Sequence, residues 1–230
     1  MAYQIKGANI VSYRDFNFRR LHIEHPTFQP KSECFVSSLK YNLSKNAKPE
    51  RFFLQTPRMK IVDIVQSDKQ VVIICEFPTK HPKFYDVIYG LDETVIETLL
   101  KKSKKWFAQK NKLDKVDLEE LYSSSILPPE SLVSKPRIRF KIPIYDGSIQ
   151  CLTFDKHEKK IPFGNVRIGG QVVALLGLES LYYYKEKWYL DWTVFQLKWC
   201  PKVKVETKYL FDDDSDDEYN VKDIDSDYEN

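Results

Sequence analysis

Basic and aromatic side chains alternate in several short stretches of this sequence, a combination suited to binding nucleic acid. The clearest stretch is RIRFKIPIY, in which Arg137, Arg139 and Lys141 are separated by apolar residues. Cations neutralise phosphates and release counterions, and flat rings accept unstacked bases of any sequence. Stretches of this kind supply the predicted nucleic-acid-binding residues, which are Lys40, Tyr41, Arg51, Arg58, Lys60, Arg137, Arg139, Lys141, Tyr145 and Lys198.

The charge of the chain is divided between its body and its C-terminal end. Residues 211–230 hold eight Asp, two Glu and one Lys, so one positive and ten negative charges leave −9, whereas the whole chain carries +3. Residues 1–210 therefore carry +12, an excess of the sign that attracts a polyanion. A segment as acidic and as poor in apolar residues as 211–230 is predicted to be disordered.

A polyanionic tail tethered to a cationic surface has a high effective concentration near that surface. We therefore expect the tail to compete with nucleic acid for the basic groove and to bind partner proteins when a strand displaces it. The alternative is a tail that only keeps the protein soluble. The tail residues expected to contact partners are Asp212, Asp213, Asp214, Asp216, Asp217, Asp225, Asp227 and Tyr228.

Motifs for catalysis and metal binding are incomplete in this sequence. Gly164 and Gly169 have the spacing of a phosphate-binding loop, but the Lys-Ser/Thr pair that must follow them is absent. His22 and His25 lack further ligands at a recognisable spacing, and the four cysteines form no CxxC pair. The sequence therefore predicts no enzymatic activity, no metal and no cofactor, although an enzyme with a dispersed site remains an alternative.

The order of strand and helix signals favours a small barrel. Runs rich in aromatic and β-branched residues predict strands at 33–41, 59–66 and 70–77, and helical periodicity begins at Leu91, with Asp92 as a plausible N-cap. A second helix is predicted to start at Asp114. A loop at 123–136 precedes further predicted strands. The first begins at Arg137 and ends at a turn over 145–147, and the others span 148–155, 170–178 and 188–199.

Strict alternation over 137–142 places the three cations on one face of a strand and Ile138, Phe140 and Ile142 on the other. The predicted fold is mainly β, a β-rich α+β fold: an OB-like five-stranded barrel with an inserted helix, with a β-sandwich as the alternative. We expect one nucleic-acid-binding domain with an N-terminal extension over 1–210 and an acidic tail over 211–230. The chain shows neither a signal peptide nor an apolar run long enough to span a membrane, so an intracellular protein is expected.

Four stretches in this order also resemble a known family. They are FFLQTPRMKIV (52–62), FYDVIYGLDETVIETLLKKSKKWF (84–107), KIPIYDGSIQCLTFD (141–155) and WYLDWTVFQLKW (188–199). This set resembles the single-stranded DNA-binding proteins of nucleocytoplasmic large DNA viruses, which have been grouped with the OB-fold single-stranded DNA-binding proteins of short-tailed phages. The resemblance covers residues 51–199 and the tail.

The resemblance implies an early viral protein of DNA replication, recombination and repair that coats single-stranded DNA in the host cytoplasm or nucleus. It also implies an acidic C-terminus that recruits polymerase and helicase-primase, and a possible homodimer. The phage tails end in an aromatic residue, whereas Glu229 and Asn230 follow Tyr228 here, which puts the role of that ring in doubt. A structural or interaction protein of a virion or replication compartment is the alternative, and the choice between DNA and RNA stays open.

Overall fold

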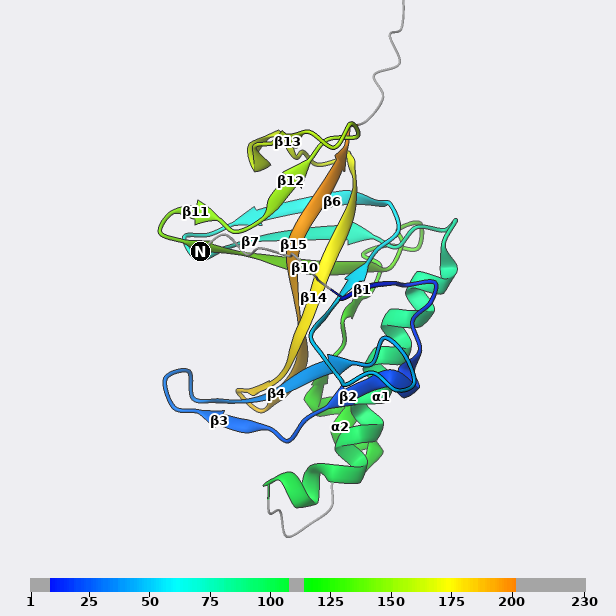
Figure 1. The fold of residues 1–230 in the computed structure, drawn as a ribbon, viewed down its shortest axis with the longest axis vertical. Coiled ribbons are helices and arrows are strands. Elements are labelled where there is room, and N and C mark those ends of the chain that lie inside the picture. Colours follow the sequence, from blue (N-terminus) through cyan, green and yellow to red (C-terminus); the bar gives the residue numbers. More distant parts are fainter. Residues whose placement is uncertain (1–8, 108–113, 202–230) are drawn as a thin grey trace, which may run out of the picture.

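The computed structural model describes residues 9–107 and 114–201 (Figure 1). The tail predictions for residues 211–230 therefore lie outside the described residues. Within the described part of the chain, no helix is both long enough and apolar enough to cross a membrane.

Five strands form a closed barrel. In the order in which they pair, they are β6 (Met59–Gln66), β7 (Gln70–Glu76), β10 (Arg137–Tyr145), β15 (Lys187–Cys200) and β14 (Gln171–Tyr184). Strand β14 pairs again with β6 and closes the ring, and β10 and β15 form its one parallel pair. This is the five-stranded OB arrangement, with the helices inserted between β7 and β10, so the predicted fold class is confirmed (Figure 1).

The interior of the barrel is filled by alternate residues of its strands. On β10, Ile138, Phe140 and Ile142 are at most 2% exposed, and the three cations between them point outward, as the alternation predicted. Strand β14 passes close to its neighbour at Gly177, where a Cβ atom would lie 2.4 Å from Cε2 of Phe195. A side chain at position 177 would therefore require the Phe195 ring to move.

Helix α1 (Pro82–Phe107) packs beside the barrel and leads into α2 (Lys115–Leu121) (Figure 1). The predicted start at Leu91 is wrong because the buried stripe continues upstream through Phe84 and Ile88 to a proline that suits a first helical turn. Asp92 is therefore no N-cap but a buried residue within α1. The predicted start of α2 is confirmed, since Asp114 caps it and forms a capping box with Asp117.

Residues 9–55 widen the barrel wall. They form β1 (Asn9–Ser12), η1 (Phe18–Arg20), β2 (Leu21–Ile23), β3 (Thr27–Gln29), β4 (Cys34–Tyr41) and β5 (Phe52–Gln55). Strand β4 pairs with the end of β14 and carries β2 and β3, whereas β5 pairs with the middle of β14 and carries β1. Strand β14 can hold both because it runs to Tyr184, beyond the predicted end at Leu178.

Short elements fill the remaining connections. They are β8 (Tyr122–Ser123), β9 (Ile126–Leu127), β11 (Ser148–Ile149), β12 (Leu152–Phe154), β13 (Lys160–Ile161) and η2 (Phe163–Asn165). The single return strand predicted over 148–155 is divided, because the chain crosses from one neighbour to another. Strand β11 pairs with β10, and β12 pairs in parallel with β15.

Candidate nucleic-acid interface

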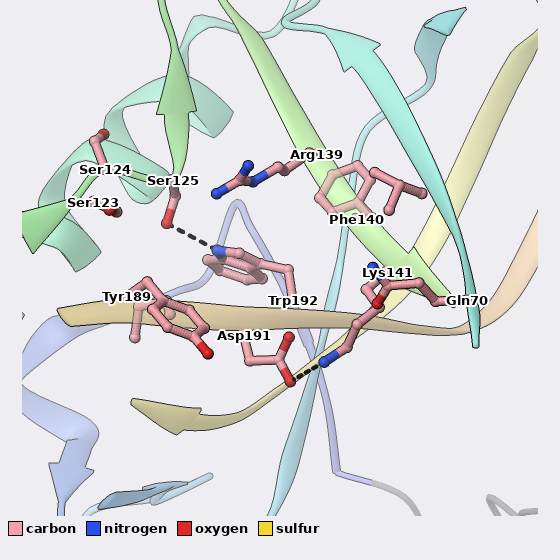
Figure 2. A pocket seen from close by; sticks show the side chains of 12 residues that line it. Gln70, Ser123, Ser124, Ser125, Arg139, Phe140, Lys141, Tyr189, Asp191 and Trp192 are labelled. Atoms are coloured by element: carbon pink, nitrogen blue, oxygen red, sulfur yellow. Dashed lines mark hydrogen bonds and ion pairs between the residues drawn. The ribbon is translucent and has the colours of Figure 1, made fainter. Parts of the chain in front are cut away.

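A hollow of about 310 Å³ lies on the outer wall of the barrel over β7, β10 and β15. We call it the groove. One side is formed by the segment Ser123–Ser125, and the floor by residues of the three strands, both outward ones such as Arg139 and buried ones such as Trp192 (Figure 2). In OB barrels the second and third strands and the loops joining strands 1–2 and 4–5 bind oligonucleotides. Strands β7 and β10 hold the second and third places in this barrel.

Two cations of β10 line the groove and differ in their surroundings. Lys141 Nζ lies 2.6 Å from Asp191 Oδ2 on β15, so its charge is already balanced. Arg139 is exposed, and within residues 9–107 and 114–201 it has no ion-pair partner. Its side chain points from β10 toward Ser125 (Figure 2). A phosphate entering the groove would therefore meet Arg139 as an uncompensated positive charge.

Tyrosine rings extend the groove along the hairpin of β14 and β15. Tyr189 lines the groove and stacks on Tyr182, with ring centroids 5.5 Å apart and an angle of 10° between the planes. Burial, followed by the nearby Asp191 carboxylate, raises the pKa of both phenols, so both remain protonated donors at neutral pH. Tyr184 is 39% exposed near the hairpin turn, with Lys185 Nζ 5.3 Å from its ring centroid.

A buried carboxylate on α1 holds the side of the groove in place. Asp92 accepts hydrogen bonds from the Tyr122 hydroxyl (2.7 Å), the Ser124 hydroxyl (2.7 Å), and the Ser125 amide and hydroxyl (2.9 Å each). Ser125 Oγ in turn accepts from Trp192 Nε1 at 2.9 Å. Burial raises the pKa of Asp92, although these hydrogen bonds act in the opposite direction. The network joins α1, segment 123–125 and β15.

A second hollow, of about 610 Å³, lies where β6 and β14 begin and β7 ends. We call it the basic cleft, since its described lining holds Arg58, Lys60, Lys80 and Lys135 together with one carboxylate, that of Glu76. Lys60 Nζ lies 3.6 Å from Glu76 Oε1. The other three cations have no ion-pair partner in the described part of the chain, and all three are exposed.

The structure divides the predicted site residues among several places. Arg139 and Lys141 line the groove, and Arg58 and Lys60 line the basic cleft. Arg137 lines neither hollow: on β10 it lies opposite Glu76 of β7, and its guanidinium forms an ion pair with Glu130.

Three predicted residues lie outside both hollows, and their side chains already have partners. Tyr41 is 2% exposed and packs against Phe52, so no face of its ring is free for a base. Lys40 Nζ lies 2.6 Å from Glu24 Oε1. Lys198 Nζ lies 3.8 Å from Glu158 Oε1.

Two further predicted residues sit elsewhere on the barrel. Arg51 lies over the rings of Phe53 and Phe195, with Cζ 5.1 Å and 4.8 Å from their centroids. Tyr145 is 55% exposed at the end of β10. It lies beside the loop between β6 and β7, since the Ile144 amide donates to the Lys69 carbonyl.

The sequence prediction missed Tyr189, Asp92, Lys80 and Lys135. Tyr189 had a readable signal, because in WYLDW the residues at 189 and 191 alternate with buried ones, as on β10. The other three had none, since their positions depend on contacts between segments far apart in the sequence.

Comparisons with known proteins give only weak similarities. No family model matches the chain, and no curated protein matches it. Among solved structures, gp2.5, a single-stranded DNA-binding protein encoded by bacteriophage T7, is 12% identical with a TM-score of 0.46, covering 70% of this chain and 97% of that one. The single-stranded DNA-binding protein from bacteriophage Enc34 is 8% identical with a TM-score of 0.41, covering 83% and 96%.

The Enc34 protein in complex with single-stranded DNA is also similar, with 8% identity, a TM-score of 0.37 and coverage of 79% and 93%. Similarities this low do not place the chain in a family. The resemblance to proteins of nucleocytoplasmic large DNA viruses therefore stays a prediction.

Proposed function

We propose that this protein binds single-stranded DNA in the groove, without sequence specificity and without catalysis. The observation that carries the proposal is the combination of an unpaired Arg139 with the stacked rings of Tyr182 and Tyr189 on one outer wall of the barrel. The cation meets phosphate, and the rings offer faces and edges to unstacked bases. Because a ring accepts any base, such a surface binds strands of any sequence.

The shape of the groove favours a single strand over a duplex. Its volume of about 310 Å³ admits isolated bases, and its rings contact bases only where these are not paired and stacked. Among the described residues, two cations line it, one of them balanced by Asp191, whereas tight duplex binding rests on many phosphate contacts.

We further propose that the protein acts in viral DNA replication, recombination and repair. In this proposal, the acidic tail competes with DNA for the basic surface and, when displaced, recruits replication proteins. The support is the charge of −9 on residues 211–230 against +12 on residues 1–210. The family resemblance adds polymerase and helicase-primase as the expected partners, and a homodimer as the expected assembly.

Fluorescence polarisation with the full chain tests the proposed DNA binding. Labelled oligo-dT, oligo-rU and a matched duplex DNA are titrated at several salt concentrations. We expect oligo-dT to bind more tightly than the duplex and to lose affinity as salt rises. The double variant Arg139→Ala/Tyr189→Ala should lose most of this binding.

The matched control removes the same residue types from surfaces outside the groove, as Arg19→Ala/Tyr89→Ala, and should bind like the unchanged chain. Arg19 is exposed on η1, and Tyr89 is 53% exposed on α1. Equal affinity for duplex and oligo-dT, or equal losses in the two double variants, would refute the proposal. A stable oligomer without DNA affinity would instead favour an interaction protein, and preference for oligo-rU would reassign the ligand to RNA.

A further inference from the structure

We infer that the acidic tail, residues 211–230, docks on the basic cleft and not in the groove. This inference refines the regulatory part of the proposed function by giving the tail a place on the barrel. It rests on three features: the balance of charge in the two hollows, the position at which the described chain ends, and the length of the connecting segment.

The first feature is the balance of charge. The basic cleft holds four cations and one carboxylate, and Arg58, Lys80 and Lys135 have no ion-pair partner among residues 9–107 and 114–201. The groove holds two cations and one carboxylate, and Lys141 is already paired with Asp191. A polyanion gains the most electrostatic binding energy where positive charge is least compensated, so we expect the tail to bind the cleft more strongly than the groove.

The second feature is the place where the described chain ends. Cys200, the last residue of β15, pairs with Gln171 at the start of β14. Gln171 also pairs with Lys60 on β6 and lines the basic cleft. The chain therefore leaves the barrel beside the cleft. The groove is farther away, since Asp191 lies nine residues back along β15, about 30 Å at the rise of a strand.

The third feature is the length of the segment that follows. Asp212, the first residue of the acidic run, comes eleven residues after Pro201, and a fully extended chain of that length spans at most about 40 Å. The acidic run can therefore reach the cleft without strain. Tethering so close to the exit point raises the effective concentration of its carboxylates at the cleft above that at the groove.

Docking in the cleft also explains how the tail could compete with DNA without filling the groove. Arg137 adjoins Glu76, which adjoins Lys60, so the outer wall is continuous from the groove to the cleft across β10, β7 and β6. A strand leaving the groove in this direction would meet the cations that hold the tail. Long strands would then displace the tail, whereas strands short enough to fit the groove would not.

Carbodiimide cross-linking of the full chain in the absence of DNA tests the inference. The reagent joins a lysine amine to a nearby carboxylate as an amide, and mass spectrometry identifies the joined peptides. We expect tail carboxylates to couple to Lys60, Lys80 or Lys135, with a yield that falls at high salt. The yield should also fall several-fold in Arg58→Gln, which removes a cleft charge without removing a reactive amine.

The control variant is Arg19→Gln, which removes an exposed arginine elsewhere and should leave the cross-links unchanged. Coupling of the tail to Lys69 or Lys141 near the groove, with none to the cleft lysines, would overturn the inference. So would the absence of tail cross-links, or equal yields in Arg58→Gln and the unchanged chain. In those cases, weaker oligo-dT binding by Arg58→Gln would assign the cleft to DNA. Because no DNA is present in the cross-linking, its result is independent of the proposed DNA binding.

Discussion

The groove and the basic cleft are hollows in the wall of one barrel, but they are built from different chemistry. Among the described residues, the groove offers rings, hydroxyl groups and one uncompensated cation, Arg139. The described lining of the cleft offers three uncompensated cations, and its one phenylalanine ring, Phe77, is 5% exposed. The more positively charged of the two hollows is therefore not the one that carries rings for binding bases. Binding that depends on shape and binding that depends on charge can be perturbed separately.

The largest effect is expected from removing the carboxylate that holds the side of the groove. Asp92→Ala leaves the buried donors of Tyr122 and Ser125 without an acceptor, so the free energy of unfolding should fall by about 3 kcal/mol. Urea unfolding measures this loss. Asp86→Ala, an exposed acid on the same helix, is the control and should change stability little. Equal stability of the two variants would show that the network does not hold this wall.

The next effect concerns the rings of the groove. Tyr189→Ala should weaken oligo-dT binding by about 1–3 kcal/mol, the range for loss of a stacked base, without changing the cleft cross-links. Titration of labelled oligo-dT measures the affinity. The matched control is Tyr89→Ala on the outside of α1. An unchanged affinity in Tyr189→Ala would remove this ring from the interface.

A smaller effect separates the cations of the two hollows. With an oligo-dT of about four nucleotides, near the smallest site size of an OB fold, Arg139→Gln should reduce the slope of log K against log salt by about 0.7. Arg58→Gln should leave that slope unchanged, because the short strand does not reach the cleft. Affinity measured at four or more salt concentrations gives both slopes. Equal changes in the two variants would show that the hollows act as one site.

The smallest expected effect is a pH dependence of the free energy of unfolding that arises from Asp92, the carboxylate behind the side of the groove. Burial raises the pKa of Asp92 above its ordinary value of 3.8, so the folded chain holds this proton more tightly than the unfolded chain. The stabilisation from protonated Asp92 is therefore fully present below 3.8 and is lost as pH rises through the raised pKa. In Asp92→Asn this loss should be absent. Urea unfolding from pH 4 to 7 compares the two, and parallel curves would contradict the expectation.

The sequence predicted the features that depend on local periodicity. Arg139 and Lys141 face outward because their neighbours on β10 alternate into the core, and Asp114 caps α2 because its capping partner lies three residues on. The prediction failed where long-range pairing decides. Lys60 shares a cleft with Lys135 because β7 pairs with both β6 and β10, and Lys135 lies just before β10. Asp92 is not the predicted cap, because its hydrogen-bond partners lie 30 or more residues away.

The double use of β14 has a consequence for the order in which the chain can be assembled. Ser37 on β4 pairs with Leu181, and Leu54 on β5 pairs with Leu176. The N-terminal strands therefore pair with a strand that is synthesised near the end of the chain. In a chain emerging from the ribosome, β4 can already pair with β2 and β3, and β5 with β1, but the edges of β4 and β5 that pair with β14 stay open until β14 appears. Contacts between such distant segments slow folding and leave strand edges open to other chains in the meantime. The wall formed by β4, β5 and β14 is therefore the part of the barrel in which paired strands are synthesised furthest apart in time.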